Sequence, residues 1–219
     1  MKASVLPLFV GVGIMLVSCG SEERISREVF EEVQQANEVK KVSEVDIFNE
    51  AMKWGEEISL EAQKQLMAIL TKAVEEKGPE GAVKFCHVEA LPLLKELGDQ
   101  YGVTIRRVSN QYRNPVDQPH GEEKMLLEAY EYNQEHGLKH TPNVQRTDDG
   151  STLLFTKAIT IPNGLCLNCH GQVGTDISAE TSQKLSQVYP QDKATGHNIG
   201  DLRGMWSIAI PQKAIVDRL

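Results

Sequence analysis

The stretch DDGSTLLFTKAITI, residues 148–161, combines a turn with a strand and indicates how the second half of the chain folds. Asp148-Asp149-Gly150 is a typical turn sequence, and the apolar run that follows it has the length of a strand. Residues from about Val144 onward are therefore predicted to form the other arm of a hairpin. Two further segments, 103–108 and 202–210, are also predicted to be strands.

Long helical patterns precede the strands. Apolar residues recur at spacings of three and four over residues 47–77 and again over residues 79–101. Gly78 separates the two patterns, and Pro92 is expected to kink the second one. Shorter helical patterns cover residues 122–136 and 178–188. Helices first and strands later predict an α+β domain with an antiparallel sheet.

The N-terminus has the features of a bacterial export signal. Lys2 is followed by an apolar run over residues 5–17, which is shorter than the roughly 20 residues that a membrane-spanning helix needs. The run ends at Ser18-Cys19, which resembles the lipobox of bacterial lipoproteins, where the cysteine is lipidated. An ordinary secretory signal with an incidental cysteine is the alternative. We therefore expect residues 1–18 to be a signal peptide and Cys19 to be the lipidation site.

The expected mature chain is a tethered domain. Residues 19–46 are polar and charged and are expected to form a lipidated N-terminus and tether, followed by one domain over residues 47–219. The anchor predicts attachment to the membrane on the periplasmic side of the cell envelope, and Gly20 after the cysteine resembles an outer-membrane address. The net charge of −8 argues against nucleic acid as a partner.

The segment Cys166-Leu167-Asn168-Cys169-His170 matches the attachment signal for one covalent c-type haem. Its two thiols would bind the porphyrin vinyl groups, and His170 would be an axial iron ligand. A thioredoxin-like redox pair would need a strand-to-helix context, whereas residues 162–164 predict a loop. A zinc site would need a second ligand pair, and the remaining cysteines are Cys19 and Cys86. Export favours haem, because c-type maturation takes place outside the cytoplasm.

Other side chains have a functional and a structural interpretation. Arg106, Arg107 and Arg113 are candidates for pairing with haem propionates, since guanidinium binds carboxylate in a fork, although surface charges are equally compatible with the pattern. Cys86 lies on an apolar helix stripe and by itself fits a small buried hydrophobe. The remaining polar candidates are expected to be structural or superficial: His120, His136, His140 and His197 at the surface, and Asp201 paired with Arg203.

Several separated motifs together resemble an uncharacterised bacterial family of single-haem c-type proteins with a PAS-like fold, one member of which is known from cyanobacteria. In chain order the motifs are residues 83–86 with Pro92, 107–109, 112–115, 166–171, 189–196 and 200–207. The resemblance implies a PAS-like antiparallel sheet flanked by helices, with haem c held in its pocket. It also implies Cys86 as the distal iron ligand beside His170, although His87 follows directly and could compete for the iron.

These expectations favour a redox-active haem protein, either an electron carrier or a haem-based sensor of redox state or small gases. An unknown redox or signalling protein would be its partner. The alternative is a haem enzyme such as a peroxidase, which would need an open iron position and a distal acid–base residue. A third possibility is an assembly lipoprotein in which haem only supports the fold. No enzymatic activity is established for the family that the chain resembles.

Overall fold

The computed structural model describes residues 26–30 and 42–219, which belong to two separate units. In the first unit, Ser26 caps one helical turn over residues 27–30, and its Oγ accepts a hydrogen bond from Val29 N at 3.2 Å. The predicted signal peptide and Cys19 lie outside the described residues. Within the described ranges, no helix is both long enough and apolar enough to cross a membrane.

The second unit, Val42–Leu219, begins with helix α2, Glu44–Tyr101. Ser43 caps this helix, because its Oγ accepts a hydrogen bond from Asp46 N at 3.1 Å. The helix therefore includes residues 44–46, which the sequence placed in the tether.

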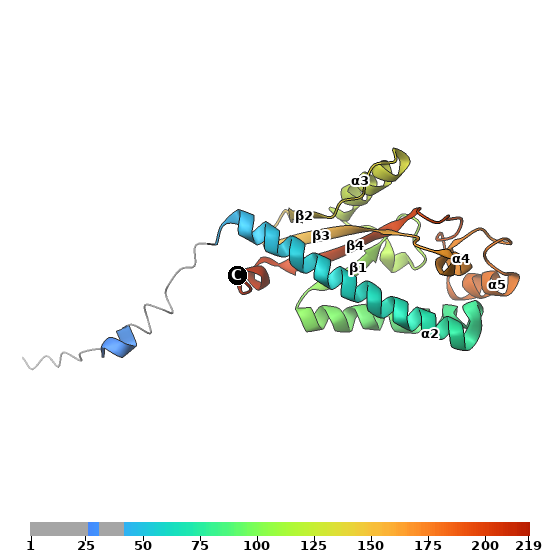
Figure 1. Cartoon of the computed structure of the whole chain (residues 1–219), viewed down its shortest axis with the longest axis horizontal. Coiled ribbons are helices and arrows are strands. Elements are labelled where there is room, and N and C mark those ends of the chain that lie inside the picture. Colours follow the sequence, from blue (N-terminus) through green and yellow to red (C-terminus); the bar gives the residue numbers. More distant parts are fainter. Residues whose placement is uncertain (1–25, 31–41) are drawn as a thin grey trace, which may run out of the picture. The chain divides into compact units, whose positions relative to one another are not determined.

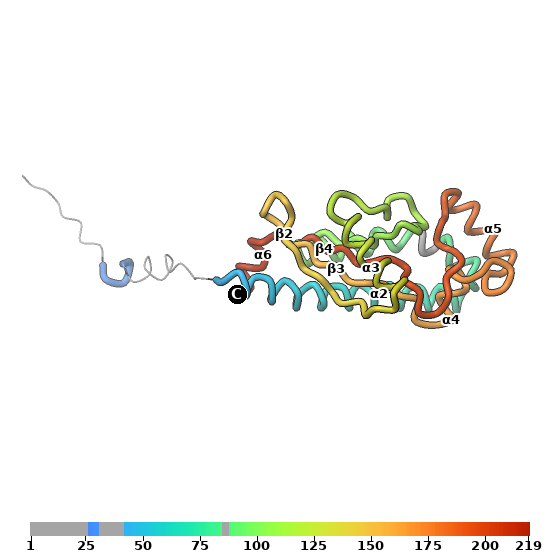
Figure 2. The backbone as a smooth tube through the Cα atoms, turned by 90° about the horizontal axis from the view of Figure 1, so that it is seen from above, coloured from blue at the N-terminus to red at the C-terminus, as the bar shows by residue number. Residues whose placement is uncertain are grey.

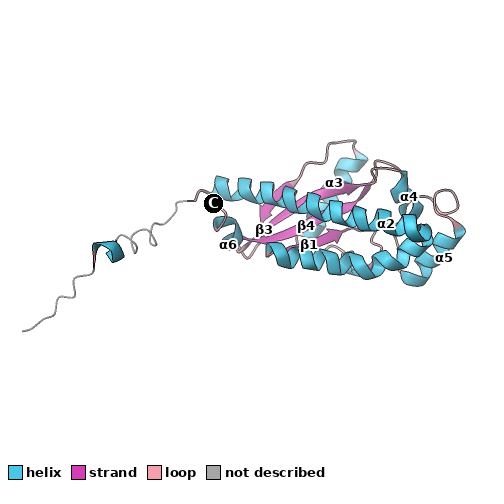
Figure 3. Cartoon of the chain, turned by 60° about the horizontal axis from the view of Figure 1, so that its bottom comes forward, coloured by secondary structure: helices cyan, strands magenta, loops and turns pink. Residues whose placement is uncertain are grey.

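Helix α2 consists of two segments that run in opposite directions (Figures 1 and 3). They meet at Gly78, whose φ of 69° and ψ of 172° break the helix at the predicted point. A positive φ of this kind carries no steric penalty for glycine, which explains why the turn occurs there. The helical assignment continues through Pro92 in the second segment.

Four antiparallel strands form one sheet with the order β1-β4-β3-β2. Their bounds are Thr104–Val108 for β1, Asn143–Arg146 for β2, Thr152–Thr160 for β3 and Leu202–Pro211 for β4. The predicted hairpin joins β2 to β3, and in its turn Asp149 Oδ1 accepts a hydrogen bond from Ser151 N at 3.0 Å. The predicted α+β domain with an antiparallel sheet is thereby confirmed.

The two faces of the sheet pack against different helices, because alternate side chains of a strand point to opposite faces. Residues Phe155, Trp206 and Ile208 pack against both segments of α2 in the main core. On the other face, Met205 packs against α3, Glu123–Glu135. This arrangement decides which strand residues can reach a site between α2 and the sheet.

Shorter elements complete the domain. They are the 3-10 helix η1, Pro115–Asp117, and the helices α4, Gly164–His170, α5, Ala179–Val188, and α6, Gln212–Val216. Figure 2 places α4 and α5 together at one end of the domain, while α6 lies at the other end near the start of α2. Ile177 and Leu185, beside and within α5, pack on Val83 of α2. This packing closes the end of the domain that carries the cysteine motif.

Candidate functional site

A cavity of about 230 Å³ lies between both segments of α2, the ends of three strands and α4. One wall is apolar and comes mainly from α2. Its members include Leu66, Met67, Leu70, Val74, Val83 and Leu91. The opposite side carries the cysteine motif and charged groups. A largely apolar cavity with a few convergent polar groups is the usual form of a cofactor site.

The motif residues Cys166, Cys169 and His170 all line this cavity. They lie on α4, where spacings of three and four bring side chains to one helix face. The helix begins here because Asn163 Oδ1 accepts a hydrogen bond from Leu165 N at 3.0 Å. The short helix is therefore the structure that presents both thiols and the imidazole to the same space.

Both cysteines are present as thiols. Burial raises the pKa of Cys166 above its ordinary value. A thioredoxin-like pair instead lowers the pKa of its attacking thiol, so this environment does not favour disulfide exchange. Among the side chains that the structure describes, which exclude those of residues 85–87, no three His, Cys, Asp or Glu are grouped to hold a metal ion.

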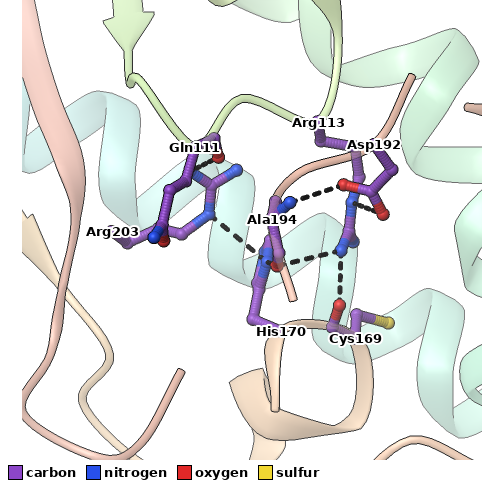
Figure 4. Close-up of polar contacts among 7 residues, drawn as sticks. All are labelled: Gln111, Arg113, Cys169, His170, Asp192, Ala194 and Arg203. Carbon is purple, nitrogen blue, oxygen red and sulfur yellow. Dashed lines mark hydrogen bonds and ion pairs between the residues drawn. The ribbon is translucent and has the colours of Figure 1, made fainter. Parts of the chain in front are cut away.

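His170 is held in one tautomer by the backbone. Its Nδ1 lies 2.7 Å from the carbonyl oxygen of Ala194 (Figure 4). A carbonyl has no proton to give, so Nδ1 carries the proton and Nε2 is the unprotonated nitrogen that can bind a metal. Arg203 Nε is 3.3 Å from the same Nδ1 and therefore cannot also donate a hydrogen bond to it. This contact brings the positive charge of Arg203 close to the imidazole ring.

The surroundings keep this imidazole neutral. Burial, followed by the positive charges of Arg113 and Arg203, lowers the pKa of His170 well below its ordinary value. A neutral imidazole is the form that coordinates metals.

Arg113 connects α4 to the segment that follows α5. Its Nε pairs with Asp192 Oδ2 at 3.2 Å, and its Nη2 donates to the carbonyl oxygens of Cys169 and of Ala194, the latter at 3.3 Å (Figure 4). The predicted propionate partner thus lines the cavity but already has partners within the protein.

The same segment returns to α4 through its backbone. His197 N donates to His170 O at 2.9 Å, and Gly196 N donates to Gly171 O at 2.8 Å. These bonds fix the end of α4 independently of the arginine.

Positive charge is in excess around the cavity. Arg107, Arg113 and Arg203 line it, together with a single described carboxyl group, Asp117. Arg107 Nε is buried without a hydrogen-bond partner among the described residues. Burial and the neighbouring arginines lower the pKa of Arg203 to about 9, so it still carries its charge at neutral pH. A ligand with carboxylate groups would complement this excess of positive charge.

Burial also affects the Asp117 carboxyl group, which lines the cavity. Burial raises its pKa above the ordinary value, although Arg107, Arg203 and Arg106 act in the opposite direction.

Arg106 is not brought to the cavity, in contrast to the expectation from the sequence. It neighbours Arg107 on β1, so the two side chains point to opposite faces of the sheet. Arg106 Nη1 pairs with Glu123 Oε2 at 2.6 Å, and its Nη2 donates to the carbonyl oxygens of Val116 and Gln118. The alternation of a predicted strand could have separated the two arginines in advance.

The side chains of Cys86 and His87 lie outside the described residues, so the distal ligand stays a prediction. Their backbone belongs to the second segment of α2. Val83 and Ala90, which precede and follow them on that segment, line the cavity.

Two residues of the site differ from their predicted roles. His197 was expected at the surface, but it is only 4% exposed, and its ring centroid lies 6.3 Å from that of His170. Arg203 was expected to pair with Asp201, but its Nη1 donates to Gln111 O at 2.9 Å. The signal in the sequence for Arg203 was its place in the motif over residues 200–207.

Comparison with known proteins gives one consistent result. The sequence matches the Tll0287-like family over residues 21–211. The fold is similar to the crystal structure of the cyanobacterial heme-protein Tll0287, with a TM-score of 0.52 and 25% sequence identity. That match covers 70% of this chain and 92% of the other. No curated protein matches the chain.

Proposed function

Because the chain belongs to the Tll0287-like family, we propose that it binds one haem c, attached covalently through Cys166 and Cys169, with His170 as an axial iron ligand. The proposal is supported chiefly by the position of these three side chains, which all line the same cavity. A heme-protein of similar fold supports haem as the group that the cavity holds.

The residues around the cavity suit the different parts of a haem. The apolar wall from α2 would cover the porphyrin ring, and the two thiols would each form a thioether bond. Arg107 and Arg203 would pair with the propionates, because Arg107 Nε has no partner among the described residues and Arg203 is a buried cation. Haem, when bound, supplies one-electron redox chemistry and an iron centre for small gases.

Hydrogen bonding within the protein would prepare His170 to bind the iron. The Ala194 carbonyl holds the proton of His170 on Nδ1, so that Nε2 can face the iron. We propose Cys86 as the second ligand within a PAS-like domain, with His87 as its rival. A thiolate favours oxidised iron, so we expect a low potential for a c-type haem.

Two protein ligands would favour electron transfer or haem-based sensing of redox state or gases. The second candidate function is that of a haem enzyme such as a peroxidase. The position and surroundings of Asp117 favour this candidate. This carboxyl group lines the cavity, and burial raises its pKa toward the range where a group can exchange protons. The enzyme would also need an open iron position.

We further propose that the chain is exported and anchored by lipid at Cys19 on the periplasmic side of the envelope, in the outer membrane. Residues that follow Cys19 would tether the domain to the membrane. A redox or signalling protein would be its partner there.

The absorption spectra of the purified protein test the assignment of function. We expect a six-coordinate, low-spin ferric haem that stays with the polypeptide after acid–acetone extraction. The Cys86→Ala variant should become high-spin or water-ligated, whereas His87→Ala should keep the wild-type spectrum. The reverse pattern would reject Cys86 as the ligand, and a high-spin wild-type protein would favour the enzyme.

A further inference from the structure

We propose that Arg113 is a positioning residue that sets the strength of the hydrogen bond between His170 and Ala194, and through it the redox potential of the haem. The inference rests on the proposed function, since it needs a haem whose iron would be held by His170. It assigns Arg113 a role other than pairing with a propionate.

The geometry gives one carbonyl oxygen two donors. Ala194 O lies 2.7 Å from His170 Nδ1 and 3.3 Å from Arg113 Nη2 (Figure 4). Asp192 completes the arrangement, because its Oδ2 pairs with Arg113 Nε at 3.2 Å and its Oδ1 accepts from Ala194 N at 2.8 Å. The Asp192–Arg113 pair therefore holds both polar groups of Ala194.

The network is shielded from water. Ala194 is fully buried, and the side chains of Arg113 and Asp192 are 13% and 12% exposed. Hydrogen bonds in such surroundings influence one another more strongly than they do in water.

The segment around Ala194 does not depend on Arg113 alone for its position. Lys193 N donates to Tyr112 O at 2.9 Å, and the backbone bonds from Gly196 and His197 to α4 flank the carbonyl on its other side. Loss of the arginine should therefore change the hydrogen bond at Ala194 O without releasing the segment.

The expected direction of the change in redox potential follows from the two hydrogen bonds that Ala194 O accepts. A second donor reduces the capacity of the carbonyl to accept from His170, so the bond from Nδ1 is weaker than it would be alone. A weaker bond makes the imidazole a poorer electron donor to iron, which disfavours the oxidised state. Arg113 thus raises the potential, and its positive charge acts in the same direction.

The Arg113→Lys variant separates the hydrogen bond from the charge. Lysine keeps the charge but lacks the planar guanidinium, whose Nε pairs with Asp192 while its Nη2 donates to both carbonyl oxygens. We expect the holoprotein to retain its covalent haem and its axial ligands, and its midpoint potential to fall. In the reduced, CO-bound protein, the NMR signal of the His170 Nδ1 proton should move downfield.

Two further variants complete the test. Arg106→Lys is the matched control, since Arg106 lies on the other face of the sheet and pairs with Glu123, and its potential should equal that of the wild type. Asp192→Asn removes the anion that neutralises Arg113, so the potential should rise. Opposite shifts for Arg113→Lys and Asp192→Asn support the proposal, because simple loosening of the segment would shift both variants the same way.

Failure of the role proposed for Arg113 can be distinguished from failure of the proposed function. An unchanged or raised potential in Arg113→Lys, or shifts of the same sign in both variants, would overturn the role of Arg113. If Arg113→Lys does not accumulate as holoprotein, Asp192→Asn decides, and a potential that does not rise overturns the proposal. A wild-type chain without covalent haem would instead refute the proposed function itself.

Discussion

Two neighbouring histidines, His170 and His197, are surrounded by positive charge. Burial lowers the pKa of His197, and Arg203 and Arg113 act in the same direction, while Asp201 opposes them. In the unfolded chain this imidazole has its ordinary pKa, 6.5. Below that pH the unfolded state binds more protons than the folded state, so the free energy of unfolding decreases as the pH falls.

We predict that His197→Gln makes the protein less sensitive to acid. The urea midpoint of the wild type should fall between about pH 7.5 and about pH 5, and the variant should lose less over the same interval. Each unit of pKa difference contributes about 1.4 kcal/mol. His120→Gln is the control, since His120 is exposed and away from the cavity, and it should keep the wild-type dependence. An unchanged dependence in His197→Gln would show that the buried imidazole does not contribute.

The sequence predicted those site residues that belong to one contiguous motif. Cys166, Cys169 and His170 could be identified because five consecutive residues carry their chemistry. Arg203 could not, because its contact with His170 spans 33 positions and depends on how β4 follows the returning segment. His197 was misplaced for the same reason, since polar neighbours in sequence do not reveal that a segment folds back onto α4.

At the scale of elements, the close contact between α2 and the sheet depends on Gly55. A Cβ atom at this position would lie 2.2 Å from Cγ of Phe155, which is itself fully buried in β3. The aromatic ring has no free space into which it could move, because it belongs to the main core.

Gly55→Ala should therefore destabilise the domain by about 1–3 kcal/mol, since α2 would have to move away from the strands. Gly164→Ala is a matched control, because a Cβ atom there would meet nothing within 4 Å. Urea unfolding of both variants measures the difference. Equal midpoints for Gly55→Ala and the wild type would mean that the helix and sheet adjust without cost.

Elements with strong local signals were predictable, and short ones were not. The Asp149 turn fixed the hairpin, and Gly78 fixed the break in α2, because each depends on the chemistry of a few adjacent residues. Helices α4 and α6, of 7 and 5 residues, are too short for a periodic pattern to be recognised. The start of α2 was placed too late because the Ser43 cap, rather than an apolar residue, begins the helix.

At the scale of the whole molecule, the order of the sheet could not be read from the sequence. The last strand, β4, inserts between β1 and β3, although both of them precede it in the chain. This insertion brings Arg203, at the start of β4, to the same cavity as Arg107 on β1. A site built from separated segments thus depends on topology, which local patterns do not specify.

The predicted lipid anchor is also a property of the whole chain. If Cys19 carries more than one acyl chain, the protein should sediment with membranes and partition into detergent, because two or more chains hold stably. Cys19→Ser should move the protein to the soluble fraction, with the haem spectrum unchanged. Fractionation followed by intact-mass measurement checks this, and an unmodified N-terminus in the wild type would rule the anchor out.

Covalent attachment of a single haem can be measured on one tryptic peptide. Trypsin cleaves after Lys157 and Lys184, and the peptide between them, residues 158–184, contains Cys166, Cys169 and His170. Mass spectrometry of the peptide from the mature protein should give its calculated mass plus one haem, with the visible absorption of haem in the same fraction. A peptide that carries free thiols or a disulfide, with no added haem, would show that the haem is not covalently attached.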